Sequence, residues 1–350
     1  MIILTNSDSN QYLKSLTTYD SLFSLQAVLA KNLVDYGRDH NLIPPRAVIE
    51  TPKGVTHLFM PTIGDNIGIK ALTGSREGFK GMTAILNPDN GIPLGVLNAE
   101  SVTAFRTALA SSLAFDKFAF SQDKGSTVTD IVCYGSGLQA YWHVRLALIW
   151  QFTKPSGGSP LGKVNVHLWN RTLPRIQELK AQLEADLSSE SWFKKFVSVN
   201  VVEDPSIVTP KCQIIFGCTP STDPIIKYAH INHDPSIRVF ISLIGSYKPH
   251  MQEADSELID SIDGKILVDS GDHVYHEAGE IIINKVSRDK LLEISYFWDG
   301  EDKQKVNVGN TKDNIVLWKC VGLSIMDICV SAEIIRVAQE HGFGQKIENF

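Results

Sequence analysis

Short apolar runs alternate with helical patterns in the middle of the chain, from about residue 116 to about residue 310. Helical patterns at residues 139–150 and 174–187, the second after an Asn/Thr-type start, predict helices between these runs. Parallel strands need a crossover, usually a helix, to return the chain, so this alternation predicts βαβ units in a mainly parallel sheet. The strand candidates are residues 130–134, 164–168, 196–202, 212–216, 239–244 and 265–269.

The pattern differs on both sides of this region. Within residues 1–115, leucines at helical spacing predict a helix over 21–36, and short runs at 56–60, 68–72 and 82–86 predict strands. The last of these strands enters a hairpin turn at Asn90-Gly91. Residues 314–342 have one long helical pattern, broken by Gly322. We therefore expect an α/β protein with divisions near residues 115 and 310, in keeping with a length of 350 residues.

Composition and charge narrow the class of protein. Hydrophobic residues make up 43% and charged residues 21%, which is ordinary for a folded globular chain. A net charge of −6 leaves no basic footprint for nucleic acid or for an anionic membrane surface. The apolar stretch at 141–152 is too short to span a bilayer, and residues 1–6 lack the basic start of a secretory signal. We expect a cytoplasmic protein with no nucleic-acid or membrane partner.

The cysteines support the same compartment. There are five, none in CxxC spacing, and most lie inside apolar runs, so we expect buried reduced thiols and no disulfide framework.

The first strand of the middle region leads directly into a glycine-rich turn and then a helix. This is the G-x-G-x-x-G/A pattern in the strand–turn–helix context that dinucleotide binding requires. The first glycine allows the tight turn, the second lets the backbone approach the pyrophosphate, and Ala140 permits close packing of helix on strand. The free N–H groups of the helix N-terminus favour phosphate. The cofactor-binding positions predicted here are Gly135, Ser136, Gly137, Leu138 and Gln139.

The end of the second strand bears on the choice of cofactor. Asn170, Arg171 and Thr172 stand where NAD-binding proteins usually place an acidic residue for the ribose hydroxyls. An arginine there is suited to a 2′-phosphate, which favours NADP(H), with NAD(H) as the alternative. Arg171 as a solvated charge at a strand end is the other interpretation.

Several short segments follow one another along the chain in a particular order and spacing. They are residues 61–70, 91–94 followed by 103–107, 135–139, 244–249 with Asp255, 268–270 with 277–279, and Val321-Gly322 before Asp327. None of them is specific alone. Together they resemble the ornithine cyclodeaminase/mu-crystallin family over nearly the whole chain.

The resemblance implies a division of labour. Residues 1–115 would form a substrate-binding and dimerisation domain, residues 116–310 the NAD(P)-binding Rossmann domain, and residues 311–350 a C-terminal helix that returns to the first domain. It also implies a homodimer and a small imino or amino acid as substrate. Further cofactor contacts would come from Cys218, Thr219, Gly245 and Val321.

Mapped by spacing, the residues that bind the substrate carboxylate in the family fall on Arg46, Lys70 and Arg106. The chemistry agrees, because a guanidinium offers two parallel donors to a carboxylate and a lysine adds a point charge or a proton. The alternatives are an outward-facing lysine on an edge strand, a surface arginine on a helix and an arginine in an exposed loop.

The chain departs from the family pattern at two positions. Tyr247 stands in place of the catalytic aspartate of the cyclodeaminases, and His57 in place of a glutamate. A phenol is neutral and mainly donates, and a histidine can serve as a general acid–base but supplies no fixed negative charge. Losing two carboxylates argues against ornithine as the substrate. Lys70, His57 and Tyr247 are the candidate catalytic residues, although His57 could equally be a packed or surface histidine.

A histidine-containing segment at residues 269–277 does not match the H-E-x-x-H zinc pattern and lacks a further ligand set, so no metal is predicted. Taken together, we expect an NAD(P)H-dependent reductase of a ketimine or cyclic imino acid resembling pyrroline-2-carboxylate, with hydride transfer at Cα. Two alternatives stay open: an amino-acid dehydrogenase or cyclodeaminase running in the reverse sense, and a non-catalytic NADPH-binding protein like mu-crystallin.

Overall fold

The computed structural model describes residues 1–75, 78–120, 128–155, 162–300 and 306–348. The chain divides into two compact units, which we describe separately. Unit 1 comprises residues 1–110 and 322–350, and unit 2 comprises residues 111–321. The sequence of residues 154–160 is rich in turn-forming residues and predicts an enlarged surface loop, and most of it lies outside the described residues. No helix in the described part of the chain is long and apolar enough to cross a membrane.

Unit 2 is built on an eight-stranded sheet in which all the neighbouring strands are parallel. Its strand order is β13-β12-β14-β11-β10-β7-β8-β9. The strands are β7 (Asp130–Tyr134), β8 (Val164–Trp169), β9 (Val197–Val201), β10 (Ile214–Gly217), β11 (Val239–Leu243), β12 (Ile266–Val268), β13 (Leu291–Glu293) and β14 (Ile315–Lys319). The helices are α4 (Leu138–Thr153), α5 (Leu173–Asp186), α6 (Ser191–Phe196), α7 (Ser256–Ser261), α8 (Gly271–Glu277) and α9 (Gly279–Ile283).

The direction of winding reverses between β7 and β10. From β7 the chain proceeds to β8 and β9 on one side, and then returns to add β10, β11 and β14 on the other. In open parallel sheets, ligands bind outside the carboxyl ends of the strands at such a switch point. The glycine-rich turn after β7 lies at this point, and the Rossmann-type fold predicted from the sequence is confirmed.

One element of unit 2 was predicted wrongly. The helical pattern read over residues 314–342 begins with a strand, β14, which lies between β11 and β12, and the helix starts only at Ser324. The run Ile-Val-Leu-Trp-Lys is buried throughout, and a fully buried strand has no alternation that distinguishes it from a buried helix. The short strand β13 was not predicted either.

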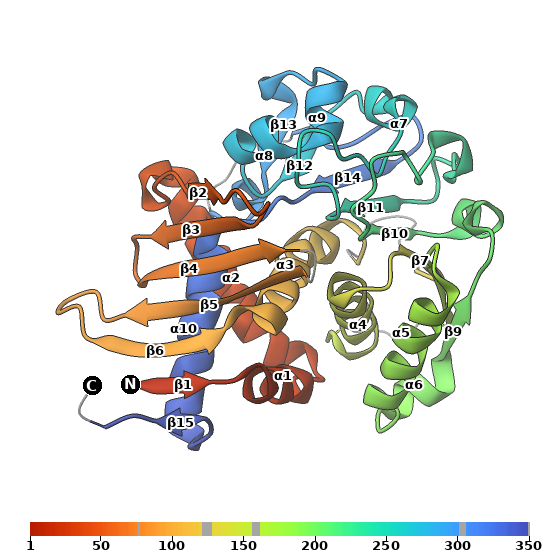
Figure 1. Ribbon diagram of the computed structural model, residues 1–350. Helices are drawn as coiled ribbons and strands as arrows, with labels where there is room; N and C mark the ends of the chain where they lie inside the picture. Colours follow the sequence, from red (N-terminus) through yellow and green to blue (C-terminus); the bar gives the residue numbers. More distant parts are fainter. Residues whose placement is uncertain (76–77, 121–127, 156–161, 301–305, 349–350) are drawn as a thin grey trace. The chain divides into compact units, whose positions relative to one another are not determined.

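Unit 1 contains a seven-stranded mixed sheet that joins both ends of the chain (Figure 1). Its order is β15-β1-β6-β5-β4-β3-β2. The strands are β1 (Ile2–Leu4), β2 (Ala47–Glu50), β3 (Thr56–Thr62), β4 (Ile67–Ser75), β5 (Gly78–Leu86), β6 (Pro93–Asn98) and β15 (Gln345–Lys346). The helices are α1 (Asn6–Ser15), α2 (Tyr19–Arg38) and α10 (Ser324–His341), together with α3 (Ala99–Phe118), most of which belongs to this unit.

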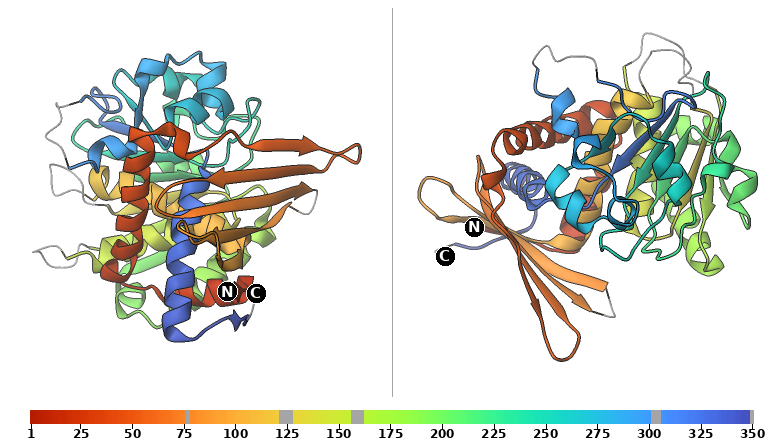
Figure 2. Two further views of the ribbon diagram at one scale, coloured as in Figure 1. Left: turned by 90° about the vertical axis from the view of Figure 1, so that its left-hand side faces the viewer. Right: turned by 90° about the horizontal axis from the view of Figure 1, so that it is seen from above.

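The two faces of this sheet differ in burial. We call the face that carries Met60, Lys70 and Leu97 the inner face; it is packed against α10, which in turn packs against α2. Figure 2 shows both helices on one side of the strands. The outer face carries Phe59 and Met82, which are 39% and 46% exposed. Strand alternation in β3 to β6 therefore divides the sheet into a buried face and an apolar face without a cover from the described residues.

Candidate active site

Two cations and one carboxylate meet on the inner face of unit 1. Lys70 Nζ donates to Asp327 Oδ1 at 2.7 Å, and Arg106 Nε donates to the same oxygen at 3.1 Å. All three side chains are buried: Lys70 and Asp327 are at most 1% exposed and Arg106 is 5% exposed. We call this set the Lys70 cluster. The structure thus places Lys70 and Arg106 together, and excludes the outward-facing alternatives for both.

Local structure explains why these side chains converge. Lys70 pairs with Met60 across β3 and β4, and so shares the inner face that α10 covers. Asp327 lies in the first turn of α10, where the positive end of the helix dipole favours a carboxylate. No side chain caps the N-terminus of α10. The cluster therefore combines two side-chain cations with the positive end of a long helix.

The charges of the Lys70 cluster do not balance. Burial, chiefly, lowers the pKa of Lys70 from 10.5 to about 8; the charge of Asp327 opposes this shift, and those of Arg106 and Arg46 add to it. Asp327 Oδ2 is buried and accepts no hydrogen bond from any described residue. One carboxylate thus partly neutralises two neighbouring cations, and the remaining positive charge is suited to an anionic ligand.

Gly322 makes room for the guanidinium of Arg106. Its φ is +91°, in the left-handed region, and a Cβ built there would lie 2.8 Å from one terminal nitrogen of Arg106. Both facts require glycine at this position. Gly322, which interrupts the helical pattern of the C-terminal region, therefore has two roles: it allows the turn before α10 and leaves space for the Arg106 guanidinium.

The remaining two sequence candidates of unit 1 lie outside the cluster. Arg46 directly precedes β2, and its positive charge helps to lower the pKa of Lys70. His57 stands on the outer face, opposite Thr73, and its Nδ1 lies 3.0 Å from Thr73 Oγ1. Strand alternation therefore puts His57 and Lys70 on opposite faces of the sheet, so within one chain His57 does not accompany Lys70.

The glycine-rich turn of unit 2 has the geometry that a dinucleotide needs. Gly135 has φ +127°, and a Cβ there would meet the carbonyl oxygen of Cys218 at 2.6 Å, so only glycine fits. A Cβ on Gly137 would meet nothing within 4 Å, which leaves the space where a phosphate would approach. Gly137 is also the N-cap of α4 and supplies no side chain, so the N–H groups of Ser136, Leu138 and Gln139 border an uncapped helix terminus. These residues fit a dinucleotide pyrophosphate.

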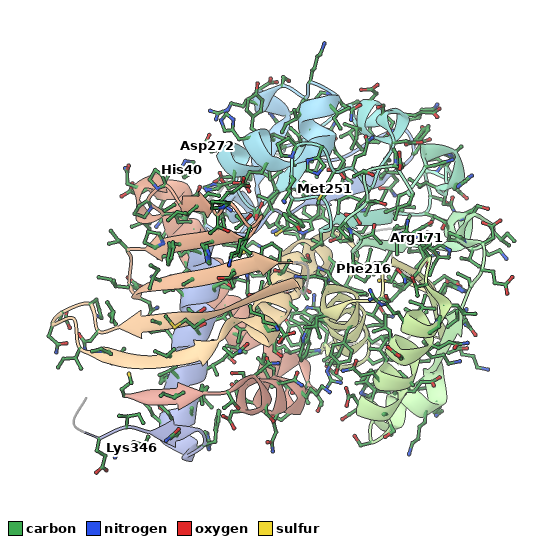
Figure 3. All side chains as sticks on the ribbon, viewed as in Figure 1. His40, Arg171, Phe216, Met251, Asp272 and Lys346 are labelled. Atoms are coloured by element: carbon green, nitrogen blue, oxygen red, sulfur yellow. The ribbon has the colours of Figure 1, made fainter. Side chains whose placement is uncertain are left out.

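The polar residues after β8 lie beside this turn. The N–H of Gly135 donates to the carbonyl of Trp169 at 2.8 Å, which ties the turn to the end of β8. Asn170, Arg171 and Thr172 follow immediately, and the side chain of Arg171 is exposed (Figure 3). Asn170 Nδ2 donates to the carbonyl of Thr172 at 3.2 Å. The arrangement leaves the guanidinium of Arg171 accessible to a ligand, and equally to water.

The other predicted cofactor positions of unit 2 follow the carboxyl ends of strands. Cys218 and Thr219 come after β10, Gly245 after β11 and Val321 after β14. The carboxylate of Asp269, itself 2% exposed, accepts the N–H of Val321 at 3.2 Å. These segments therefore border the switch-point edge of the parallel sheet, as binding at that edge requires.

Tyr247 also follows β11. Its side chain is half-buried, which raises the pKa of the phenol, so the hydroxyl is protonated at neutral pH. It can donate a hydrogen bond but cannot take the part of a carboxylate.

Sequence reasoning missed the partners of the predicted residues. Asp327 was noted only as part of the family pattern, with no role, although an acidic residue within the mainly apolar run 323–330 was a signal. Glu253 and Glu280 had no signal in the sequence, and both are fully buried in unit 2. Among the described residues, no group of three His, Cys, Asp or Glu side chains is placed to hold a metal ion.

Comparison with known proteins assigns the family. The model of the ornithine cyclodeaminase/mu-crystallin family matches residues 28–341, which cover both sites described above. The chain belongs to this family. The resemblance seen in the sequence is confirmed.

Curated relatives of this family align with almost the whole chain. An uncharacterized protein of Saccharomyces cerevisiae is 29% identical over 95% of this chain and 96% of its own length. A Δ1-pyrroline-2-carboxylate reductase of Bacillus cereus is 25% identical over 84% of this chain and 85% of its own.

Solved structures share the fold of both units. The Δ1-pyrroline-2-carboxylate reductase of Thermococcus litoralis, in complex with NADH and L-proline, has a TM-score of 0.76 at 21% identity, covering 99% of this chain and 100% of its own. An archaeal alanine dehydrogenase dimer with bound NAD has a TM-score of 0.75 at 19% identity, covering 100% of this chain and 99% of its own.

Proposed function

We propose that this family member is an NADPH-dependent reductase of a ketimine or cyclic imino acid, of the pyrroline-2-carboxylate type. A bound reduced nicotinamide supplies a hydride, which adds to Cα of the C=N bond while a proton goes to the nitrogen, giving an amino acid and the oxidised nicotinamide. The observation that carries the proposal is the unbalanced positive charge of the buried Lys70 cluster, which is suited to the carboxylate of such a substrate.

Arg106 and Lys70 have different parts in this proposal. The guanidinium of Arg106 is held through Nε by Asp327, and its Nη1 also lies 3.2 Å from Met326 Sδ. A thioether sulfur is a weak acceptor, so the terminal nitrogens can exchange this contact for a carboxylate. Lys70, with a pKa of about 8, is mostly protonated at neutral pH yet gives up its proton more easily than an ordinary lysine. An iminium accepts hydride better than a neutral imine, so a lysine of this kind is suited to keep the substrate nitrogen protonated. Arg46 adds positive charge near both.

The test is a turnover assay with purified protein and NADPH against a panel of cyclic and open-chain imino acids, following the absorbance of the reduced nicotinamide. We expect oxidation of NADPH by at least one carboxylate-bearing imine, and none by the same ring without its carboxylate. Turnover only with an amino acid and NADP⁺ would support the dehydrogenase or cyclodeaminase alternative. NADPH binding without turnover of any substrate would support a binding protein like mu-crystallin.

We propose NADP(H) as the preferred cofactor because Arg171 is exposed beside the glycine-rich turn and no acidic residue follows β8 directly. The variant Arg171→Asp loses a charge-assisted contact with the 2′-phosphate and adds repulsion, so NADPH binding should weaken by about tenfold or more. NADH binding should change little. Arg175→Asp, one turn into α5, is the matched control. Equal effects on both cofactors would remove this role from Arg171.

We further propose a homodimer formed through the outer face of unit 1. Ile49, Phe59 and Met82 are each more than a third exposed on that face, and apolar groups gathered in this way are typical of interfaces. Phe59→Glu should convert the protein to monomers in sedimentation, whereas Ile207→Glu, at a 67% exposed residue of unit 2, should not. A monomeric wild-type protein would contradict the proposal. The cytoplasm stays our prediction for the compartment.

A further inference from the structure

The carboxylate of Glu253 joins two segments of unit 2 that follow neighbouring strands. Oε1 accepts the N–H of Thr219 at 2.7 Å and its hydroxyl at 3.0 Å. Oε2 accepts the N–H of Gly245 at 2.6 Å. Thr219 follows β10 and Gly245 follows β11. One buried side chain therefore binds the two segments that leave the carboxyl ends of these neighbouring strands.

Further buried polar and charged groups lie around Glu253. The backbone N–H of Glu253 donates to Glu280 Oε1 at 2.7 Å, and Ser246 Oγ donates to the same carboxylate at 2.6 Å. Lys319, at the end of β14, donates to the carbonyl oxygen of Ser246 at 2.6 Å, and its Nζ lies 3.7 Å from Glu280 Oε2. We call Glu253, Glu280, Ser246 and Lys319 the Glu253 cluster. Burial, chiefly, raises the pKa of the neighbouring thiol of Cys218, and the charge of Glu253 adds to this shift.

The segments that contain Thr219 and Gly245 are closely packed against each other. A Cβ built on Gly245 would lie 1.9 Å from the carbonyl oxygen of Thr219, so the two backbones are in direct contact. A Cβ on Gly217 would lie 2.9 Å from Glu253 Oε1. Glycine at both positions is what allows the carboxylate to reach the two N–H groups, and a small movement of the carboxylate must therefore move the segments.

We propose that Glu253 is a positioning residue for the dinucleotide: its ionised carboxylate fixes the segments after β10 and β11, and protonation of this carboxylate loosens them and weakens dinucleotide binding. The proposal rests on the cofactor site proposed above, in which Thr219 and Gly245 border the ligand. It does not depend on the substrate or on NADP(H) being preferred over NAD(H).

Hydrogen-bond chemistry gives the reason. An ionised carboxylate has acceptor positions for all three donors, whereas a protonated one must place a hydrogen on one oxygen. If Oε1 carries it, the hydroxyl of Thr219 can turn to accept, but the N–H of Thr219 is left with only the weaker acceptor of a protonated oxygen. Weakening the hydrogen bond of a buried donor is unfavourable, so that segment is held less firmly.

Electrostatics places the change in the neutral range. Burial, chiefly, raises the pKa of Glu253 from 4.5 to about 7; Glu280 also raises it, while Lys319 and the N–H groups of Thr219 and Gly245 lower it. If only the ionised form binds well, the apparent affinity follows the ionised fraction. Between about pH 8 and about pH 6 that fraction falls by roughly tenfold for such a group, and the dissociation constant should rise in proportion.

The experiment is calorimetric titration of the full-length protein with NAD⁺, which has no group that titrates in this range, at about pH 6, 7 and 8. Repeating it at pH 7 in two buffers of different ionisation enthalpy measures proton release. We expect several-fold tighter binding at the higher pH and release of a fraction of a proton. In Glu253→Gln, which cannot ionise, we expect no proton release and a flat pH dependence.

A matched control and a second variant complete the design. Glu257→Gln makes the same chemical change at an exposed residue of α7 and should behave as wild type. Glu280→Gln removes a negative neighbour, so the midpoint of the pH dependence should move to lower pH, even if Glu253→Gln does not fold. Wild-type binding of NAD⁺ that is independent of pH, or a pH dependence that persists in Glu253→Gln, would overturn the proposal. The experiment measures NAD⁺ binding and not imine turnover. Failure of the reductase proposal can therefore be distinguished from failure of the proposal for Glu253.

Discussion

Each unit buries a small charged cluster, and the two are opposite in composition. In unit 1, Lys70 and Arg106 share the single carboxylate of Asp327. In unit 2, two carboxylates, Glu253 and Glu280, have Lys319 as the cation of their cluster. Burial favours the uncharged form in both clusters. It is the main reason that the pKa of Lys70 is lowered to about 8 and that of Glu253 is raised to about 7.

What differs is how the excess charge is satisfied. The excess negative charge of unit 2 accepts backbone N–H groups of the protein itself, at Thr219, Gly245 and Glu253. Among the described residues of unit 1, Lys70 and Arg106 share Asp327 as the carboxylate of their cluster, and the first turn of α10 adds more positive potential. A buried charge that is hydrogen-bonded by the protein's own backbone stabilises the local structure. A buried charge without full compensation from the protein is suited to bind a ligand of opposite charge.

The largest effect should follow from removing the charge at Lys70. Lys70→Ala takes away a carboxylate ligand and the proposed proton donor, so kcat/KM for the imino acid should fall at least ~10²-fold. NADPH affinity, measured by fluorescence titration, should stay near the wild-type value because the glycine-rich turn proposed to bind the dinucleotide belongs to unit 2. Lys53→Ala, at an exposed turn residue, is the control. An equal loss of NADPH binding would show that Lys70 belongs to the cofactor site.

A matched pair of variants tests the comparison. Each variant removes the single residue whose charge is opposite to that of the other charged residues in its cluster. Asp327→Asn leaves two buried cations, and Lys319→Met leaves two buried carboxylates; each should lower the free energy of unfolding by about 3–5 kcal/mol, as measured in urea. The pH effects should be opposite. Removing Asp327 lowers the pKa of Lys70, so the loss of turnover as pH rises through about 8 should begin at lower pH.

Removing Lys319 raises the pKa of Glu253, so the midpoint for NAD⁺ binding should move up. Each variant leaves the other cluster intact and so controls for it. If both moved the same midpoint, the two clusters would not be independent, and the comparison drawn here would be wrong.

The smallest effect is expected at His57. Because it lies on the outer face of the sheet, paired with Thr73, His57→Ala should change kcat/KM less than about threefold, a surface-like effect. Sedimentation of the same variant checks that the outer face is otherwise undisturbed. A tenfold loss of turnover with unchanged assembly would return His57 to the list of catalytic residues.

The sequence predicted those features that depend on local pattern. The helix over 21–36 is observed as α2 and begins after a capping box at Thr18, and the strand before Gly135 is observed as β7. The glycines of the dinucleotide turn were predictable because their conformational requirement is local: Gly135 has a φ that only glycine adopts readily.

What could not be predicted depends on contacts between distant segments. The hydrogen bond between Lys70 and Asp327 joins residues 257 positions apart, and no periodicity records such a pairing. Glu253 lies in a polar segment and Glu280 directly precedes three isoleucines, and neither local pattern records that the fold buries the two carboxylates together. The strand β14 was mistaken for helix because a strand covered on both faces is uniformly apolar.

The sheet of unit 1 has a consequence for how the protein is made. Its inner face is complete once β6 ends at Asn98, but α10, which covers that face, ends only at His341. At ~5–20 residues per second of synthesis, the apolar inner face waits on the order of tens of seconds for its cover. Unit 2, which is continuous in sequence, can fold during that interval. The nascent chain should therefore depend on a chaperone that shields strands β3 to β6, and a truncation before α10 should aggregate even though every strand from β1 to β6 is present.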